Sequence, residues 1–353
     1  MSSKVVSIDS GSSFMKAYAG REKLQFPAII RELPEDELEG KEIKVENRYY
    51  LVGDSAATSL NMVILTPHIH PGFHGSTTQY VQMCYAFERL KVSGPMDTLV
   101  CSLPFSDSRK REIKNKLRER KVFEWAMIDK DDRQHERKVV FNEVKIVPQG
   151  VGAMNFYQEK KSKARPRIAM LVDVGSCTTD VVTIKINNET HDYDYCRDAC
   201  TSIENLNVTW FKDQWTSNIE AEVRGIRKDK NYDYFSLMQH AIEKDFMMQL
   251  GDRKFDSKPS YDTTREDFAR ALLPKLKKNA GQIWDDINVI IFTGGGVPLL
   301  DFTIFPDRER IAPLDHWANV IGQFMMYGDM AEEPKKTHAP TEAVSSEATA
   351  GAA

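Results

Sequence analysis

The sequence lacks a cysteine pattern, a long apolar run and a dominant charge, and each absence excludes a class of protein. Its 353 residues include five cysteines, an odd number without a C-x-x-C pair, so neither a disulfide framework nor a zinc site is expected. No apolar run reaches the roughly 18 residues of a membrane helix. The opening segment turns polar at Asp9, too early for the core of a signal peptide. We therefore expect a cytoplasmic protein with reduced cysteines and no membrane association.

The charges are balanced, with 48 basic and 52 acidic residues and a net charge of −4. This balance excludes a uniformly basic surface for nucleic acid. The run from Arg109 to Lys121 carries eight basic and two acidic residues, but no aromatic residue interleaves it. We interpret it as a solvated helix face or a subunit contact and expect no direct binding of nucleic acid.

Two stretches of the sequence repeat one pattern. Ile8 to Lys16 and Val172 to Lys185 each run from an apolar strand through an Asp-x-Gly-Ser turn into a second strand. Each pattern predicts a β-hairpin. A duplication at this separation predicts two related α/β domains that face each other across a cleft.

The residue types in the two turns suit a polyphosphate. Backbone N–H groups in a tight turn can converge on an anion, and glycine allows close approach. Ser12, Ser13, Thr178 and Thr179 add hydroxyl donors, and Lys16 adds a positive charge. Asp9 and Asp173 would repel a phosphate, so they are useful only around a hard cation such as Mg²⁺.

A third motif, Thr293-Gly294-Gly295-Gly296, follows the buried strand predicted at 288–292. Consecutive glycines leave open space for the sugar or base of a nucleotide, and a helix beginning next to them would face its phosphates.

These motifs carry a resemblance to a known superfamily. Residues 9–20 resemble the first phosphate loop of actin, and residues 173–180 resemble the second loop in bacterial plasmid-segregation actins of the ParM/StbA type. Thr293–Gly296 is similar to the adenosine motif, Val147–Gly150 to the first connecting segment and Ala318–Gly322 to the second connecting helix. The five landmarks occur in the order found in actins, DnaK-type chaperones and sugar kinases, and they span residues 5–327.

The resemblance implies a role for each matching position. Asp9 and Asp173 would orient water around Mg²⁺, and Gln149 would position the water that attacks the γ-phosphate. The remaining positions would hold the β-phosphate (Gly11, Ser12, Ser13, Lys16), the γ-phosphate (Gly175, Ser176, Thr178) and the adenosine (Gly294, Gly295, Gly296). Ser176 and Cys177 depart from the pattern, since many relatives have glycine there. Glu243 and Lys244 are weak candidates for reading the ribose and base.

The resemblance also implies the domain organisation. We expect an α/β protein with the actin-like fold, in which each of two duplicated domains carries a smaller inserted subdomain. Domain I would comprise residues 1–155 and 310–328 with an insertion at about 26–93. Domain II would comprise 156–309 with a mainly helical insertion at about 201–285, where Pro274 breaks or kinks a helix. Residues 329–353 have the composition of a disordered tail.

The function implied is that of a polymerising, Mg²⁺-dependent ATPase. Its filaments would segregate plasmid DNA or position another cargo through a DNA-binding adaptor protein, with GTP as the alternative nucleotide. A small-molecule kinase or a non-filamentous ATPase of the same superfamily is the main alternative. A chaperone and a non-hydrolysing scaffold are weaker ones, since no substrate-binding domain follows the last motif and Asp9, Gln149 and Asp173 are all present.

Overall fold

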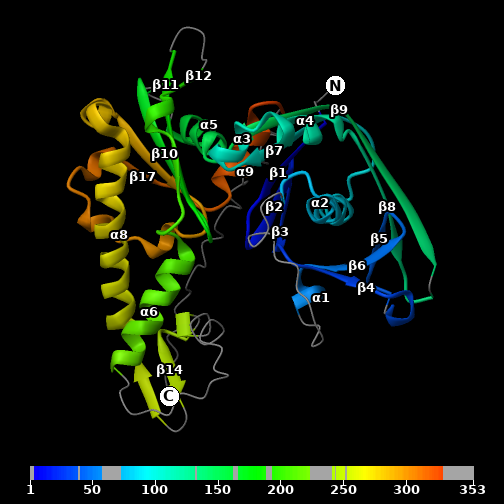
Figure 1. The fold of residues 1–353 in the computed structure, drawn as a ribbon, viewed down its shortest axis with the longest axis horizontal. Helices are drawn as coiled ribbons and strands as arrows, with labels where there is room; N and C mark the ends of the chain where they lie inside the picture. Colours follow the sequence, from blue (N-terminus) through cyan, green and yellow to red (C-terminus); the bar gives the residue numbers. More distant parts are fainter. Residues whose placement is uncertain are drawn as a thin grey trace, which may run out of the picture.

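The computed structural model describes residues 4–38, 40–57, 73–131, 133–161, 166–187, 193–222, 241–242, 244–250 and 253–328. They form two lobes, each built on its own β-sheet, with helices α3, α5 and α9 lying between them (Figure 1). The segment expected to be a tail, 329–353, lies outside the described residues. No helix in the described ranges is long and apolar enough to cross a membrane.

The first lobe contains a nine-stranded sheet in the order β3-β2-β1-β7-β9-β8-β5-β6-β4. β1, β7 and β9 run parallel to one another, and the other pairs are antiparallel. The strands are β1 (Val5–Ser10), β2 (Phe14–Ala19), β3 (Glu22–Pro27), β4 (Ile30–Leu33), β5 (Ile43–Val45), β6 (Arg48–Val52), β7 (Gly94–Leu103), β8 (Val122–Ile128) and β9 (Gln134–Pro148).

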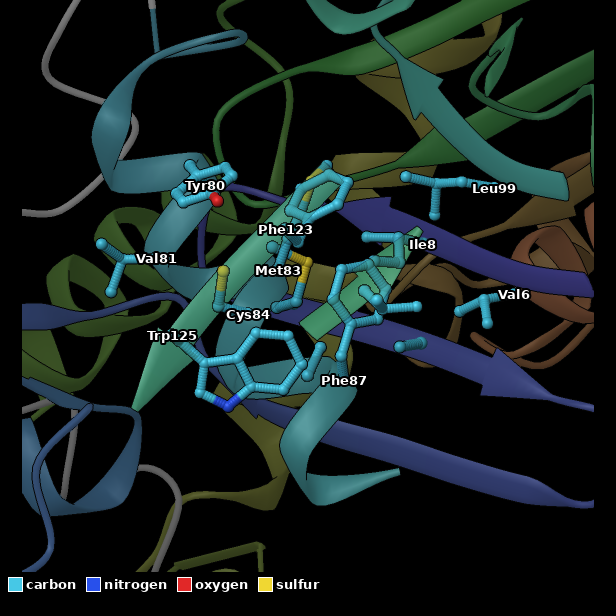
Figure 2. Packing of buried hydrophobic residues seen from close by; sticks show 14 of the residues in the cluster. Val6, Ile8, Tyr80, Val81, Met83, Cys84, Phe87, Leu99, Phe123 and Trp125 are labelled. Carbon is cyan, nitrogen blue, oxygen red and sulfur yellow. The ribbon is translucent and has the colours of Figure 1, made fainter. Parts of the chain in front are cut away.

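Helix α2 (Thr77–Arg89) lies inside the curve of this sheet. It begins at Ser76, whose hydroxyl accepts a hydrogen bond from the Gln79 N–H. Figure 2 shows Phe87 of α2 beside Phe123 and Trp125 of β8. Because the sheet surrounds α2, the helix is buried on several sides, and this cluster forms the core of the lobe.

The second lobe contains a sheet in the order β12-β11-β10-β16-β17, with β13 also paired to β11. β10, β16 and β17 are parallel and the remaining pairs antiparallel. A separate two-stranded sheet, β14–β15, lies beyond α6. The strands are β10 (Ile168–Val174), β11 (Thr179–Ile186), β12 (Tyr193–Tyr195), β13 (Thr201–Ile203), β14 (Met247–Leu250), β15 (Arg253–Asp256), β16 (Val289–Thr293) and β17 (Ile311–Pro313).

The other α-helices cover the sheets or cross between the lobes. α5 and α9 pack so closely that the Gly152 and Gly322 backbones leave no room for a side chain: a Cβ on Gly152 would lie 2.7 Å from Gln323 Cγ. Besides α2, the α-helices are α1 (Asp54–Ala57), α3 (Phe105–Ser108), α4 (Arg111–Glu119), α5 (Val151–Lys161), α6 (Val208–Glu222), α8 (Lys258–Ala280) and α9 (Ala318–Met325).

The short 3₁₀ helices lie in connecting segments. They are η1 (Glu35–Glu37), η3 (Arg197–Ala199), η4 (Gly281–Asp286), η5 (Val297–Leu299), η6 (Phe302–Ile304) and η7 (Arg308–Arg310).

The duplicated hairpins and the α/β fold class are confirmed: β1–β2 and β10–β11 are antiparallel pairs in corresponding places of the two lobes. Of the two effects predicted for Pro274, the break is wrong, because α8 runs through it from Lys258 to Ala280, and the kink stays a prediction. Pro274 and Arg270 are exposed, so water can bind the carbonyl that proline leaves without a donor. Buried Phe268, Leu272 and Leu276 hold the helix on both sides of it.

Candidate functional site

A cavity of about 520 Å³ lies between the lobes, where the turns of both hairpins meet the strand ends. Its walls come from β1, β2 and α3 on one side and from β10, β11 and the residues after β16 on the other. Of the residues proposed from the sequence, those that line it are Asp9, Gly11, Ser12, Ser13, Lys16, Gln149, Asp173, Gly175, Ser176, Thr178, Gly294 and Gly295.

The Asp9 carboxylate contacts three side chains. It lies near the end of β1, in register with Lys16 on β2 and Ser102 on β7. Its Oδ1 accepts hydrogen bonds from Ser102 Oγ at 2.6 Å and from Gln149 Nε2 at 3.2 Å. Lys16 Nζ is 3.9 Å from Oδ2. These contacts fix the carboxylate and place the Gln149 amide beside it.

Asp173 occupies the matching position on β10, in register with Thr293 of β16 and Asp180 of β11. Burial, together with the negative charge of Asp9 and Asp180, raises its pKa to about 7, against a partial opposing effect of Lys16. The electrostatic effect of Asp9 shows that carboxylates from the two lobes act on each other across the cavity.

The second turn is closed by its own hydrogen bonds. The Gly175 N–H donates to the Thr178 carbonyl at 2.9 Å, and Thr178 Oγ1 donates to Asp180 Oδ2 at 2.9 Å. Thr179, which the sequence also suggested as a donor, is buried and donates to the Leu206 carbonyl instead. In this turn, then, only Thr178 places a threonine hydroxyl in the cavity.

Of the three glycines after β16, two line the cavity and the third packs against neighbouring side chains. Gly294 has φ +95°, and a Cβ there would lie 2.6 Å from the Val174 carbonyl oxygen. Gly295 faces open space. Gly296 does not line the cavity; it packs against Val174 and Val208. The flat surface left for a ligand is therefore made by Gly294 and Gly295.

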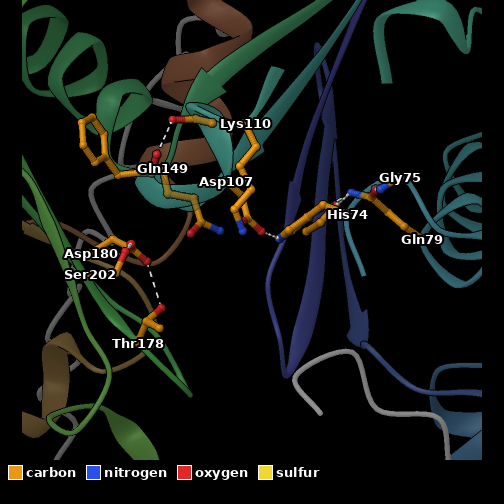
Figure 3. Close-up of polar contacts among 12 residues, drawn as sticks. His74, Gly75, Gln79, Asp107, Lys110, Gln149, Thr178, Asp180 and Ser202 are labelled. Atoms are coloured by element: carbon orange, nitrogen blue, oxygen red, sulfur yellow. Dashed lines mark hydrogen bonds and ion pairs between the residues drawn. The ribbon is translucent and has the colours of Figure 1, made fainter. Parts of the chain in front are cut away.

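The structure adds cavity residues that the motifs did not indicate. Asp107 of α3 accepts a hydrogen bond from Lys110 Nζ at 2.6 Å, and its Oδ2 lies 3.8 Å from His74 Nε2 (Figure 3). Burial lowers the pKa of His74 to about 4, more than Asp107 and Asp9 raise it. Lys110 belongs to the basic run that we interpreted as a solvated helix face or a subunit contact. The feature of the sequence that could have indicated its place in the cavity is its position shortly after the end of a strand.

Asp180, the last residue of the second loop, also lines the cavity, although the sequence analysis assigned it no role. It accepts hydrogen bonds from Thr178 and Ser202 (Figure 3), and burial raises its pKa. It stands at the start of a strand after a glycine turn, and its burial beside the cavity becomes visible only in the folded structure. Of the two candidates for reading the ribose and base, Lys244 does not line the cavity, and Glu243 lies outside the described residues.

The donor set fits magnesium held through water. Within the ranges that the structure describes, no group of three or more His, Cys, Asp or Glu side chains could hold a metal directly. Mg²⁺ usually keeps several waters and takes one or two carboxylates together with substrate phosphates. Asp9 and Asp173, facing one cavity, supply that number of carboxylates. A cation between them would oppose both burial and the charge of Asp9, which raise the pKa of Asp173.

Two family models match the sequence. The model described as the N-terminal domain of actin-like proteins matches residues 7–152, and the model of the C-terminal domain of archaeal MreB-like actin homologues matches 171–304. Together they match most of the chain, which belongs to the actin-like proteins. No curated protein matches the sequence.

Solved structures share the fold at low sequence identity. A ParM from a 15-stranded filament of Clostridium botulinum is 18% identical, with a TM-score of 0.68 over 92% of this chain and 99% of its own. An archaeal actin homologue in complex with ADP is 18% identical, with a TM-score of 0.68 over 92% and 98%. The actin-like protein Alp7A is 13% identical, with a TM-score of 0.67 over 92% and 95%. At these identities the likeness establishes the actin-like fold.

Proposed function

We propose that this chain is a Mg²⁺-dependent ATPase that assembles into filaments according to its nucleotide state. The observation that carries the proposal is the pair Asp9 and Asp173, which reach one cavity from opposite lobes beside Lys16 and Gln149. One similar structure contains ADP, and another was determined as a filament.

The residues divide the chemistry between the two lobes. Lys16 and the Gly11–Ser13 turn neutralise and orient the phosphates, while Gly294 and Gly295 leave room for the nucleoside. Asp9 and Asp173 would hold Mg²⁺ through its waters, and the ion would supply charge neutralisation at the phosphates when bound. Gln149, positioned by its hydrogen bond to Asp9, orients the attacking water. Such catalysis is mostly positioning and electrostatics.

Assembly follows from a cavity shared by two lobes. A triphosphate that contacts both turns favours the closed arrangement, so the nucleotide sets the angle between the lobes. We propose that a surface shaped by this angle binds the next subunit head to tail. Such a heterologous contact does not close on itself and forms an open filament. Segregation of DNA, or positioning of another cargo, through an adaptor protein is the proposed use of that filament.

Sedimentation with and without nucleotide tests the proposal. Protein at tens of micromolar, incubated with Mg-ATP or a slowly hydrolysed analogue, should enter the pellet above a critical concentration and return to the supernatant as ADP forms. GTP in a parallel sample tests the alternative nucleotide. Phosphate release, measured in the same samples, separates hydrolysis from assembly.

Asp173→Ala provides the matched control. It should abolish phosphate release while nucleotide binding survives, because the carboxylate acts on the cation and its water. A small-molecule kinase would remain in the supernatant with every nucleotide. If the analogue produces no polymer by sedimentation or electron microscopy, the filament proposal is refuted and only the nucleotide-binding fold remains.

A further inference from the structure

A second cavity, of about 460 Å³, lies on the other side of α3 from the nucleotide cavity. Pro104, Asp107 and Lys110 line the nucleotide cavity, whereas Phe105 and Arg109 line this one. The second lobe contributes Tyr195 of β12 and Arg197 of η3. The full lining is Phe105, Ser108, Arg109, Lys114, Arg118, Ile146, Pro148, Tyr195 and Arg197; we call it the basic pocket.

Among the described residues, no ion pair compensates the charge of the basic pocket. Four of its nine lining residues are cationic and none is acidic. In the part of the chain that the structure describes, no ion pair joins Arg109, Lys114, Arg118 or Arg197 to a carboxylate. Other basic residues of the same run are paired: Lys110 with Asp107, and Lys116 with Glu112. Four like charges from α3, α4 and η3 around one hollow cost free energy that an anionic occupant would recover.

The rest of the lining is largely apolar. Phe105 and Tyr195 lie with ring centroids 6.3 Å apart, and Arg109 lies over the Phe105 ring at 5.8 Å. Ile146 and Pro148, near the end of β9, complete this apolar part. Tyr195 is 39% exposed, so its ring presents apolar surface to an occupant. Aromatic rings and arginines are the residue types enriched where binding energy concentrates in interfaces.

We propose that the basic pocket docks an acidic peptide segment of a partner protein, with an apolar side chain against Tyr195 and carboxylates at the guanidinium groups. A free phosphate would satisfy the charges but would leave the apolar residues uncovered. A purely apolar peptide would leave four cations unpaired. An acidic segment with an apolar anchor complements both parts, and Arg can bind its carboxylates in bidentate fashion. The proposal concerns a site separate from the nucleotide cavity and goes beyond the proposed function.

Fluorescence anisotropy with defined probes tests the docking. The primary probe is a fluorescein-labelled dodecapeptide of alternating glutamate and leucine. The comparison probes are the same peptide with glutamine in place of glutamate, a polyglutamate dodecapeptide, labelled single-stranded DNA, and unlabelled tripolyphosphate as a competitor. We expect the Glu-Leu peptide to bind at least tenfold more tightly than the glutamine peptide and more tightly than polyglutamate.

Two variants locate the binding, and a third is the matched control. Arg118→Glu and Tyr195→Ala should each weaken binding of the Glu-Leu peptide, Arg118→Glu by at least tenfold. Lys116→Glu makes the same charge change on α4, outside the pocket, and should change affinity by less than threefold. Melting temperature and nucleotide affinity of each variant establish that the fold and the nucleotide cavity are intact, so this test is independent of ATPase and filament activity.

Several results would overturn the proposal. Equal weakening of peptide binding by Arg118→Glu and Lys116→Glu would mean that the peptide is attracted by the overall positive charge of this surface and does not bind in the basic pocket. Displacement of the peptide by tripolyphosphate, together with wild-type peptide affinity of Tyr195→Ala, would assign the pocket to a phosphate ligand, and preferential binding of the DNA would assign it to nucleic acid. Equal binding of the glutamate and glutamine peptides would remove the role of charge.

Discussion

Replacing Asp173 by asparagine should stabilise the nucleotide-free protein at neutral pH although it removes a proposed functional group. The Asp173 carboxyl is buried and its pKa is raised from 3.8 to about 7, first by burial and then by Asp9. Between these two pH values the folded state binds a proton that the unfolded chain has lost. The free energy of unfolding therefore falls as the pH rises from about 4 to about 7. Asparagine has no charge to bury, so this loss disappears.

The size of the effect follows from the pKa difference. One pKa unit corresponds to about 1.36 kcal/mol, so a shift of about three units sets an upper limit of roughly 4 kcal/mol at pH 8. We expect about half of this, because the asparagine amide also loses hydration in the cavity. For a domain of about 150–250 residues that unfolds cooperatively, a stabilisation of 2 kcal/mol raises the melting temperature by about 4–8 °C. At pH 5 the electrostatic contribution falls to about a third, and the gain should disappear because the hydration loss of the amide does not depend on pH.

Calorimetry of the nucleotide-free protein at pH 5 and pH 8, without added divalent cation, measures this difference. Asp301→Asn is the matched control, because Asp301 caps η6 through the Thr303 N–H and these hydrogen bonds lower its pKa. Its replacement should leave the melting temperature at pH 8 unchanged or slightly lower. A melting temperature of Asp173→Asn at or below wild type at pH 8, or a gain independent of pH, would refute the reasoning.

Three further predictions address the site and its frame. Gln149→Ala should lower kcat for ATP at least tenfold and change nucleotide Kd by less than threefold in steady-state and binding assays; an equal loss of affinity would contradict its role with water. Gly294→Ala should lower the melting temperature, because φ is +95° and Val174 is too close, whereas Gly295→Ala, which meets nothing, should leave it unchanged. Gly152→Ala should destabilise the protein by more than about 2 kcal/mol in urea unfolding, because α5 cannot keep its contact with α9; a wild-type midpoint would contradict the tight crossing.

The sequence predicts the parts of the site that depend on local patterns. The turn around Gly11 is held by neighbouring residues, and so is the turn around Gly175, where the bond to Thr178 spans three residues. Such turns can be recognised without knowing what packs against them. The repeated Asp-x-Gly-Ser motif therefore predicts corresponding positions for Asp9 and Asp173 without knowledge of their long-range contacts.

Features that depend on long-range pairing could not be predicted in this way. The region expected to form an inserted subdomain at about 26–93 contains β4, β5 and β6, which extend the large sheet because β5 pairs with β8. The short strand β5, with three residues, carries almost no periodic signal of its own. Likewise, His74 reaches Asp107 across 33 positions of the chain, and nothing near either residue in the sequence indicates the other.

The arrangement of charge gives a physical reason for nucleotide dependence. Asp9 has Lys16 Nζ at 3.9 Å, together with two hydrogen-bond donors. Within the described ranges, no ion pair joins Asp173, on the opposite lobe, to a basic side chain. Closing the cavity without a cation would bring two carboxylates nearer to each other, and burial followed by the charge of Asp9 already raises the pKa of Asp173. A divalent cation with a polyphosphate changes that balance, since the cation faces the carboxylates while Lys16 and the turns face the phosphates. Neither lobe holds a complete set of these groups, so we expect bound nucleotide to bring the lobes together and its loss to let them separate.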